Sequence, residues 1–578
     1  MDELTAKRIA QWLSGPYDAE TKREIKRLQK EDTKTLEDAF YCDLEFGTGG
    51  MRGIIGVGTN RMNKYTVGAA AQGIANFLKE TVEELPKIVI SYDSRIKSAD
   101  FAKISADIFS ANGIMTYLFD DIRPTPELSF AVRELQCDAG VMITASHNPK
   151  EYNGYKVYWK DGGQLVPPQD KQVMNHVKAV DDISKILWKR DAKLVTKIGK
   201  KIDDIYLKQV RSLSIHLPKS ERAKNLKIVY TPLHGTGIAL VPKALKRFGF
   251  NNVTVVEEQA IPDGTFPTVV YPNPEEAEAL KMSLEYAERI QADLVLATDP
   301  DADRVGIAVR NAEGKMQLLN GNQTATLLVN YVLEHRLKPG NDIRNPYIVK
   351  TIVTTDLLCD MALSYNIECR EVLTGFKYIA ETIRKLEGNG TYLVGGEESY
   401  GYLVGDFVRD KDAVSACCLI AEMAACYMVT HRDNHRLLTE VLDDIYRKYG
   451  LYREGLVSLT KKGQDGLQEI QKMMDNFRQN PPQSIAGIEV IKMHDILLQK
   501  YYDYRYDTNG PLNLPVSNVL QFFLRDGSKV TVRPSGTEPK IKFYFSVVGR
   551  VAKRNELEPM KAQLAQKIED LKAAVLAF

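Results

Sequence analysis

One pattern recurs along this chain of 578 residues: a short apolar strand ends abruptly in a loop of small and polar residues, and a helical stretch follows. The strands are rich in β-branched residues and cover residues 87–92, 139–144, 227–230, 292–297 and 391–394. Short buried strands that alternate with helices are typical of βα units in largely parallel sheets. Because ligands bind beyond the carboxyl ends of the strands in such sheets, we expect the functional residues in these polar loops.

The spacing of the strands predicts an α/β protein with three similar mixed-sheet domains and a smaller α+β domain at the C-terminal end. The chain is too long for one domain of roughly 100–200 residues. In the last part, apolar runs at 519–524, 529–532 and 541–546 are typical of antiparallel strands, and a helix is expected from about Glu556. The expected domains are residues 1–210, which include an N-terminal helical extension, and residues 211–325, 326–450 and 451–578.

Charge and cysteine content narrow the class of protein. Lys and Arg number 77 against 76 Asp and Glu, so no global positive field would attract nucleic acid or an anionic membrane. The acidic start of the chain does not resemble a signal peptide. The most apolar stretch, 415–430, contains Glu422 and is too short to span a membrane, so we expect a buried helix. Seven cysteines without a CxxC pair predict a reduced, cytoplasmic protein.

Several common enzyme motifs are absent from the sequence. It contains no GxxxxGK[ST] motif, which excludes a P-loop NTPase, and no GxSxG motif, which excludes the nucleophile elbow of an α/β-hydrolase. The glycine-rich segment 47–52 lacks the third glycine of the dinucleotide-binding fingerprint. The commonest α/β enzyme classes therefore do not fit this chain.

Three carboxylates stand at alternate positions directly after the strand at 292–297. We expect Asp299, Asp301 and Asp303 to point the same way from an extended segment, where their like charges need a cation. An all-oxygen ligand set favours Mg²⁺, with Mn²⁺ as second choice. A calcium-binding EF-hand is excluded, because Arg304 and Arg310 stand where its Gly and Glu would be. A solvated acidic turn is the alternative.

A serine loop follows the strand at 139–144. Ser146 can accept a phosphoryl group if a metal and a nearby base or cation activate it. His147 could then hydrogen-bond the phosphate, and Lys156 could supply charge or act as a base. An ordinary turn is the alternative for the Ser-His pair alone, but the aspartate triplet makes the combination specific.

The loop between the last two predicted strands is suited to an anion. Arg533 can bind a phosphate through two nitrogens, while Ser535 and Thr537 add hydroxyl donors without charge. Gly536 permits a turn with exposed N–H groups, so we predict a phosphate-binding nest. A plain hairpin turn is the alternative.

A fourth loop begins at the end of the strand at 391–394. Glu397 and Glu398 could form a second metal site, but the aspartates suffice, so we favour recognition of sugar hydroxyls with Ser399. Downstream, Arg409 and Lys411 could hold a phosphate or supply a general acid, and a solvated charge cluster is the alternative.

These four loops together, in this order, resemble those of the α-D-phosphohexomutase family of phosphoglucomutases and phosphomannomutases. The resemblance rests on the motifs TASHNP, DPDADR, GEES and RPSGTEPK, and it extends from about Phe46 to Lys542. It implies four domains around one deep central cleft, three of them with a shared α/β fold. It also implies a phosphorylated Ser146 whose phosphate oxygen completes a Mg²⁺ site with the three aspartates.

The resemblance implies further roles in the cleft. Arg304 and Lys156 match residues that assist proton transfer, and Arg52 matches an arginine near the cleft entrance. Lys377 stands in a TGFK segment that is similar to that of the longer family subgroup, and we expect it to contact substrate. The same resemblance implies that Glu397 and Ser399 bind the sugar. It also implies that the phosphate that does not react is bound by Arg533, Ser535, Gly536 and Thr537.

The activity implied is that of a phosphoglucomutase, an isomerase that interconverts glucose 1-phosphate and glucose 6-phosphate. Glucose 1,6-bisphosphate would be both intermediate and activator, and Mg²⁺ the metal. Some phosphomannomutase-type members carry Met and His where this chain has Glu398 and Gly401, which favours glucose over mannose and leaves Lys411 as the candidate general acid. Phosphopentomutase or phosphomannomutase activity, a transferase that forms hexose 1,6-bisphosphate, and a non-catalytic binding protein are the alternatives. Sugar phosphates are the expected partners of a monomer or weak homodimer.

Overall fold

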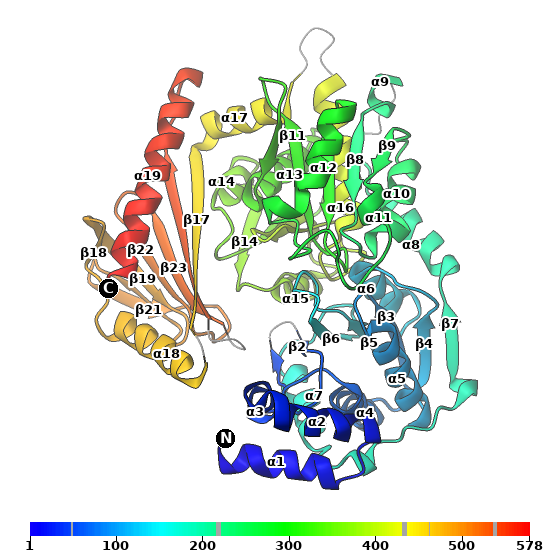
Figure 1. The fold of residues 1–578 in the computed structure, drawn as a ribbon. Coiled ribbons are helices and arrows are strands. Elements are labelled where there is room, and N and C mark those ends of the chain that lie inside the picture. The colour runs from blue at the N-terminus through cyan, green and yellow to red at the C-terminus, as the bar shows by residue number, and fades with distance from the viewer. Residues whose placement is uncertain (48–49, 216–220, 430–435, 462, 536–539) are drawn as a thin grey trace.

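The computed structural model describes residues 1–47, 50–215, 221–429, 436–461, 463–535 and 540–578, which form four sheets and the helices around them (Figure 1). We call the parts of the chain that carry these sheets domains I to IV. Three N-terminal helices precede domain I: α1 (Glu3–Ser14), α2 (Ala19–Glu31) and α3 (Thr33–Phe40). Each begins after an aspartate whose carboxylate accepts a hydrogen bond from the backbone N–H of a threonine three residues later. They lie where the sequence predicts an N-terminal helical extension.

Domain I contains a sheet of seven strands in the order β1-β2-β6-β5-β3-β4-β7. Strands β3, β4, β5 and β7 are parallel to their neighbours among these four, while β6, β2 and β1 run antiparallel. Its elements are β1 (Phe46–Gly47), β2 (Gly50–Ile54), α4 (Lys64–Thr81), β3 (Lys87–Tyr92), α5 (Ser98–Ala111), β4 (Met115–Phe119), α6 (Thr125–Glu134), β5 (Ala139–Ile143), β6 (Tyr152–Trp159), α7 (Gln169–Lys178), short 3₁₀ turns at Ile183–Lys185 and Ala192–Leu194, β7 (Val195–Ile198) and α8 (Lys200–Ser212).

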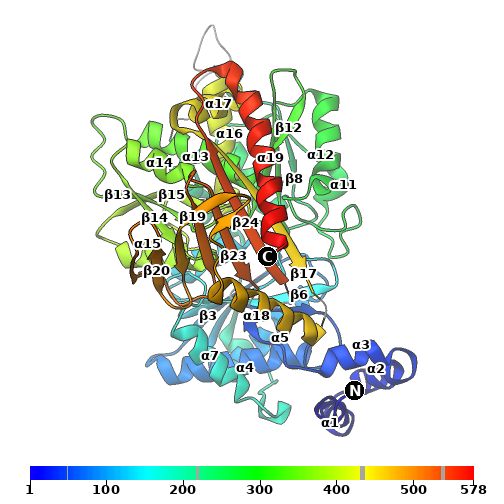
Figure 2. The ribbon, with the colours of Figure 1, turned by 90° about the vertical axis from the view of Figure 1, so that its left-hand side faces the viewer.

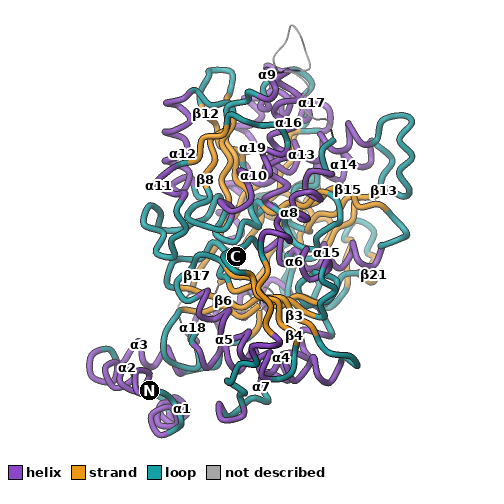
Figure 3. Tube along the Cα trace, turned by 90° about the vertical axis from the view of Figure 1, so that its right-hand side faces the viewer, coloured by secondary structure: helices purple, strands orange, loops and turns teal. Residues whose placement is uncertain are grey.

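Domain II contains five strands in the order β12-β11-β10-β8-β9. Strands β9, β8 and β10 are parallel, and β11 and β12 are antiparallel to their neighbours. Its elements are α9 (Glu221–Lys224), β8 (Ile228–Thr231), α10 (Gly237–Arg247), β9 (Val253–Val255), α11 (Glu257–Ala260), α12 (Ala277–Ile290), β10 (Leu294–Thr298), β11 (Val305–Arg310) and β12 (Met316–Leu319). In Figure 3 the helices of domains I and II lie around these strands.

Domain III contains four strands in the order β14-β13-β15-β16, of which only β16 is antiparallel to its neighbour. Its elements are α13 (Gly321–Arg336), β13 (Pro346–Thr351), α14 (Leu357–Ser364), β14 (Glu368–Val372), α15 (Phe376–Leu386), β15 (Thr391–Glu397), β16 (Gly401–Val404), α16 (Ala413–Val429) and α17 (Leu438–Tyr449).

The three sheets share one core. Numbered by their order along the chain, the four core strands lie side by side in the order second, first, third, fourth: β4-β3-β5-β6, β9-β8-β10-β11 and β14-β13-β15-β16. In each core the fourth strand is the antiparallel one. The prediction of three similar mixed-sheet α/β domains is confirmed.

Domain IV is built differently, from an antiparallel sheet in the order β17-β24-β23-β22-β19-β20-β21, with β18 paired to β19. Helices α18 and α19 both contact β24 and lie toward the viewer in Figure 2. This confirms the predicted α+β domain. Its elements are β17 (Leu451–Thr460), α18 (Gly463–Gln479), β18 (Ser484–Ile485), β19 (Ile488–Asp495), β20 (Lys500–Asp503), β21 (Thr508–Pro511), β22 (Leu520–Leu524), β23 (Lys529–Pro534), β24 (Lys540–Gly549), a 3₁₀ turn at Arg554–Glu556 and α19 (Leu557–Leu576).

The expected apolar helix is α16, which is buried on all sides. It contacts α10 and β10 of domain II as well as β16 of domain III, so it fills the core that these two domains share. Glu422 is satisfied there by Ser214, Tyr331 and a backbone N–H. Among the described helices, none is both long and apolar enough to cross a membrane.

The predicted domain limits can be compared with the positions of the observed sheets and helices. Each sheet lies inside one predicted domain, but the limits at 210 and 325 fall inside α8 and α13, so these limits stay a prediction.

Cys359 of α14 and Cys369 of β14 form a disulfide, so the expectation of a fully reduced protein is wrong for this pair. Their spacing in the sequence does not predict this contact. It forms because the chain turns back after α14, which brings the two Cα atoms to 5.1 Å from each other.

Candidate functional site

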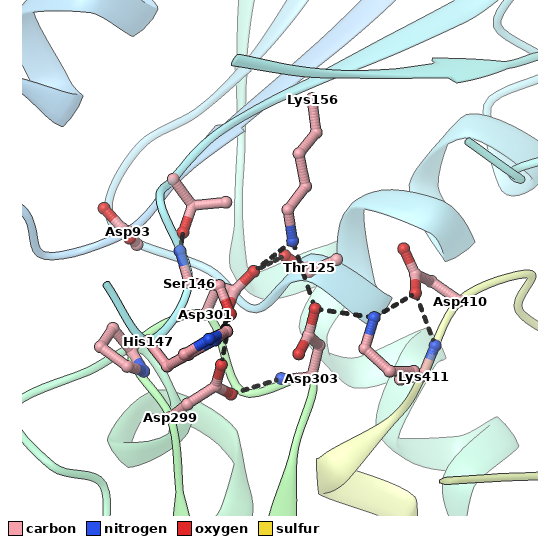
Figure 4. A network of polar contacts seen from close by, with 12 residues as sticks. Asp93, Thr125, Ser146, His147, Lys156, Asp299, Asp301, Asp303, Asp410 and Lys411 are labelled. Atoms are coloured by element: carbon pink, nitrogen blue, oxygen red, sulfur yellow. Dashed lines mark hydrogen bonds and ion pairs between the residues drawn. The ribbon is translucent and has the colours of Figure 1, made fainter. Parts of the chain in front are cut away.

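Three of the four predicted loops occupy the same place in three different domains. The serine loop (144–151) joins β5 to β6, the aspartate loop (299–304) joins β10 to β11, and the glutamate loop (398–400) joins β15 to β16. Each therefore connects the third and fourth strands of the shared core. A hydrogen bond from Ser146 to Asp299 joins the serine loop to the aspartate loop, and an ion pair with Asp303 brings Lys411 of domain III to the same point (Figure 4).

Ser146 is 3% exposed and its hydroxyl donates a hydrogen bond to Oδ2 of Asp299 over 2.7 Å. Oγ of Ser146 also lies 3.1 Å from Nδ1 of His147. The backbone of Ser146 has a φ of 53°, which is unusual for a residue other than glycine, and its N–H donates to Oγ1 of Thr144. A left-handed conformation held by surrounding bonds at a hydroxyl of this kind is typical of a functional site.

The serine loop is held from below by Arg95, which follows strand β3. Its buried guanidinium donates to the backbone carbonyls of Ser146 at 2.6 Å, Pro149 at 2.8 Å and Tyr152 at 3.0 Å, and also to that of Asn148. No sequence motif predicted a role for this arginine. Its place in a polar loop after an apolar strand, at the same sheet edge as the serine loop, is the signal that could have found it.

The three aspartates converge, but for a different reason from the one expected. The aspartate loop is a turn, not an extended segment: Ala302 has a φ of 48° and its N–H donates to the Asp299 carbonyl. The turn lets each carboxylate place an oxygen within 4.8 Å of the other two. All three residues are at most 1% exposed.

The unsatisfied oxygens of the cluster indicate where a cation would bind. Oδ1 of Asp301 and Oδ1 of Asp303 are buried and have no hydrogen-bond partner among the described residues. Burial and the two neighbouring carboxylates raise the pKa of Asp299 well above its ordinary value. Because a buried group of three carboxylates is costly without a compensating cation, and all donors are oxygens, the donor set fits Mg²⁺.

Two lysines from different domains flank the cluster. Lys156 of β6 donates to Asp301 at 2.8 Å and Asp303 at 3.2 Å, and Lys411 of domain III lies 3.1 Å from Asp303. Burial alone would lower the pKa of each lysine, but these carboxylates raise it above its ordinary value. Thr125 at the start of α6 adds a hydrogen bond of 2.7 Å to Asp301, a contact that the sequence did not predict.

Arg304 and Arg52 reach the same region. Arg304 forms an ion pair with Glu275 and lies 3.9 Å from Asp303. Arg52 of β2 donates to the side chain of Asn148 in the serine loop over 2.8 Å. Burial lowers the pKa of His147 well below its ordinary value, and the charges of Arg304 and Arg52 lower it further.

Glu397 at the end of β15 and Glu398 in the glutamate loop both accept hydrogen bonds from other parts of domain III. Glu397 accepts a hydrogen bond from the N–H of Gly375, two residues before Lys377 at the start of α15. Glu398 accepts from Thr351 at 3.2 Å and from Thr354 at 3.1 Å. Ser399 lies in the turn between β15 and β16.

The structure does not bring every predicted residue to this point. The buried side chain of Arg409 contacts Glu387 at 3.3 Å and the carbonyls of Asp406 and Val408. Arg533 and Ser535 lie at the end of β23 in domain IV, where the Ser535 N–H donates to the Lys540 carbonyl. The predicted phosphate-binding residues Gly536 and Thr537 lie outside the described residues.

Comparison with known protein families assigns most of the chain. Sequence models described as phosphoglucomutase/phosphomannomutase alpha/beta/alpha domain I, domain II and domain III match residues 43–184, 204–314 and 320–449. These three ranges contain the serine, aspartate and glutamate loops in that order.

Curated relatives cover nearly the whole chain. A protein named phosphoglucomutase from Staphylococcus aureus (strain MRSA252) is 40% identical over 522 residues, which are 90% of this chain and 92% of the relative. One of the same name from Staphylococcus haemolyticus is 39% identical and covers 89% of this chain and 92% of its own length.

Solved structures show the same fold at low sequence identity. A putative phosphomannomutase from Thermus thermophilus superposes with a TM-score of 0.65 at 21% identity, over 91% of this chain and 99% of its own. The open form of a Paramecium phosphoglucomutase, parafusin, gives 0.64 at 16% identity, over 92% of this chain and 96% of its own.

Proposed function

The chain belongs to the phosphoglucomutase/phosphomannomutase family, and we propose that it interconverts α-D-glucose 1-phosphate and glucose 6-phosphate. The reaction would run through a phosphoserine at Ser146 and a glucose 1,6-bisphosphate intermediate. The observation that carries this proposal is the buried Ser146 hydroxyl, 2.7 Å from an aspartate of a three-carboxylate cluster. Relatives that are 40% identical over 90% of the chain and bear the name phosphoglucomutase support the sugar.

In the first half of the reaction, phospho-Ser146 transfers its phosphoryl group to the 6-hydroxyl of glucose 1-phosphate. The bond between the serine oxygen and phosphorus breaks, the bond from the sugar oxygen forms, and the hydroxyl proton leaves to a base. The bisphosphate reorients in the site before the second transfer. The Ser146 oxygen then gives its proton to a base and bonds to the phosphorus of the 1-phosphate, the bond from that phosphorus to the C1 oxygen breaks, and the C1 oxygen takes up a proton, which leaves glucose 6-phosphate. Positioning and charge stabilisation account for most of the rate of such a transfer.

Asp299, Asp301 and Asp303, with a phosphoserine oxygen, would hold Mg²⁺. When bound, the ion would neutralise part of the charge on the phosphoryl oxygens. Lys156 and Lys411 add fixed positive charge beside the same carboxylates, at the place where negative charge develops. The candidates for proton transfer are Lys156, Arg304 and Lys411. Lys411 is the candidate general acid.

The remaining loops would hold the sugar and its second phosphate. We propose that Glu397 and Ser399 bind sugar hydroxyls, assisted by Lys377, and that Arg52 guides entry beside the serine loop. Arg533 and Ser535, with Gly536 and Thr537, would bind the phosphate that does not react. Because this loop belongs to the separate domain IV, a small rotation of that domain could serve both orientations of the intermediate.

Phosphopentomutase, phosphomannomutase and bisphosphate-forming activities are tested together with the main proposal. Purified protein receives Mg²⁺ and a trace of glucose 1,6-bisphosphate, and the 1-phosphates of glucose, mannose and ribose are offered separately and followed by ³¹P NMR. We expect fastest conversion of the glucose ester. Faster conversion of the ribose ester would replace the sugar and keep the mechanism, while bisphosphate accumulating without isomerisation would indicate a transferase.

The nucleophile is tested in the same assay with Ser146→Ala. Because this change removes the oxygen that carries the phosphoryl group, we expect turnover to fall by at least about 1000-fold. The melting temperature should stay close to that of the wild type. Ser184→Ala, in an exposed 3₁₀ turn of domain I, is the control and should keep full activity. Retained turnover in Ser146→Ala would exclude the phosphoserine mechanism.

A monomer or weak homodimer in the cytoplasm, acting on small sugar phosphates, stays a prediction of the sequence.

A further inference from the structure

A buried carboxylate that the proposed reaction does not use lies directly behind Lys411. Asp410 is 1% exposed, and its Oδ1 accepts hydrogen bonds from both the backbone N–H and Nζ of Lys411, at 2.8 and 3.2 Å. Its Oδ2 accepts from the hydroxyl of Tyr158 at 2.6 Å and from Nε2 of Gln164 at 2.8 Å. In Figure 4 the ammonium group of Lys411 lies between Asp410 and Asp303.

This arrangement joins three domains. Tyr158 and Gln164 belong to domain I, Asp410 and Lys411 to domain III, and Asp303 to domain II. Two further contacts next to Asp410 fix the same segment to domain I: residues 163 and 409 pair as a β-bridge, and Ser129 accepts a hydrogen bond from the 409 N–H over 2.8 Å. The backbone next to Asp410 is therefore bound to domain I, while its side chain contacts a lysine that also reaches Asp303 of domain II.

The stem of Lys411 is confined as well. A Cβ atom placed on Gly401, in the strand that follows the glutamate loop, would overlap Cδ of Lys411. The lysine stem thus fills the space that a side chain at position 401 would need. With its stem confined by Gly401 and its ammonium group held by two carboxylates, Lys411 has one well-defined position.

We propose that Asp410, held in place by Tyr158 and Gln164, is the positioning residue that aims the Lys411 ammonium group at the reacting phosphoryl group. The inference rests on the proposed function, because it assigns Lys411 to the phosphoryl-transfer site. Asp410 is not a fourth metal ligand: its two oxygens already accept four hydrogen bonds, whereas the unsatisfied oxygens belong to Asp301 and Asp303.

A double-mutant cycle separates positioning from a merely structural role. Asp410→Asn, Lys411→Met and the double variant are compared with the wild type in kcat/KM for the sugar phosphate that is turned over fastest. We expect Asp410→Asn to lose about 10- to 100-fold, the usual effect of a displaced reacting group. In the Lys411→Met background the same change should cost less than about 2-fold, because the group it orients is gone. Equal losses in both backgrounds would overturn the proposal.

Three more variants guard against a simple folding defect. Asp410→Glu keeps the charge and should recover part of the activity lost in Asp410→Asn. Gly401→Ala should lower kcat with an almost unchanged melting temperature, because the added methyl group displaces the lysine stem and meets no backbone atom first. Tyr206→Phe is the matched control: this buried hydroxyl donates to Asp412 over 2.8 Å, two residues further along the chain, and its loss should leave kcat/KM unchanged.

A readout independent of turnover comes from a crystal structure of Asp410→Asn. We expect the Lys411 ammonium group to leave its position beside Asp303, and an unchanged position would contradict the proposal. If the wild-type protein converts none of the three sugar 1-phosphates, the proposed function fails, while the position of Lys411 in this variant still decides whether Asp410 orients it.

Discussion

At the scale of single residues, Ser146 shows how the site holds a reactive group in an unfavourable conformation. Its left-handed backbone costs roughly 1–2 kcal/mol relative to an ordinary one. Arg95 offsets this by donating to carbonyls on both sides of the loop, and the hydrogen bond to Asp299 fixes the hydroxyl. The serine oxygen is therefore already oriented toward the carboxylate cluster.

The aspartate cluster leads to a prediction about metal dependence. In Asp301→Asn one charge is lost, although Thr125 can still donate to the remaining oxygen. We expect the Mg²⁺ concentration for half-maximal activity to rise by at least about 10- to 100-fold, and kcat to fall, since one oxygen facing the cation becomes a weaker ligand. A Mg²⁺ titration of initial rates measures this, with Glu313→Gln on the surface of domain II as control. An unchanged Mg²⁺ response would remove Asp301 from the ligand set.

At the scale of elements, each α/β domain uses two loops at one end of its sheet. The loop after the third core strand carries the chemistry, and the loop after the first core strand supports it: Arg95 holds the serine loop, and Thr351 and Thr354 hold Glu398. In domain II the side chain and N–H of Thr236 both donate to the Pro300 carbonyl inside the aspartate loop. The sequence pointed to both loops in domains I and II and to the second loop in domain III, but only the strand order shows which loop supports which.

Strand β17, the first strand of domain IV, contains Glu454, from which we predict a pH effect on the stability of the fold. Burial raises the pKa of Glu454 to about 7; the nearby Asp356 also raises it, while a hydrogen bond with Thr355 acts in the opposite direction. Since the folded protein binds this proton more tightly than the unfolded chain, the free energy of unfolding should fall as pH rises from about 4.5 to 7.

The test of this effect is Glu454→Gln. Because the amide carries no charge, we expect the variant to melt at a higher temperature than the wild type at pH 8, with a smaller difference at pH 5. Calorimetry at several pH values measures it, and Glu83→Gln, an exposed position in domain I, is the control. A difference that is the same at pH 5 and pH 8 would contradict the assignment.

At the scale of the whole molecule, domain IV is attached to domain III by charge and by apolar contact. Asp356 at the start of α14 accepts from Lys350 of domain III at 2.8 Å and from Lys529 of domain IV at 2.7 Å. Tyr544 of domain IV packs in one apolar cluster with Ile352 and Val353 of domain III. These contacts hold β23 and β24 of domain IV, the strands on either side of the predicted phosphate loop, against domain III.

Breaking this tie should weaken substrate binding more than it affects catalysis. In Asp356→Asn, Lys529 loses its ionic partner, and we expect KM for the sugar phosphate to rise about 5- to 10-fold, equivalent to about 1–1.4 kcal/mol, with a smaller change in kcat. Steady-state kinetics measures both constants. Asp526→Asn removes an Asp–Lys pair within domain IV and should leave KM unchanged. An unaltered KM in Asp356→Asn would show that the tie does not orient the phosphate loop.

The sequence by itself determined the class of fold and the chemistry of the site. Period and composition located the strands, and the carboxyl ends of parallel strands meet at one sheet edge, so Ser146 and the three aspartates could be selected without coordinates. The prediction of a cation site followed from charge alone. Local patterns were sufficient here because each depends on residues close together in the chain.

Only the tertiary structure decided which distant residues act together. Lys156, Asp303 and Lys411 come from three domains, and no spacing along the chain predicts their ion pairs. The same holds for the contact between the Arg409 guanidinium and Glu387, and for the pairing of Cys359 with Cys369. These outcomes depend on how separate sheets pack, and packing is set by the summed burial of whole elements, which a local motif does not contain.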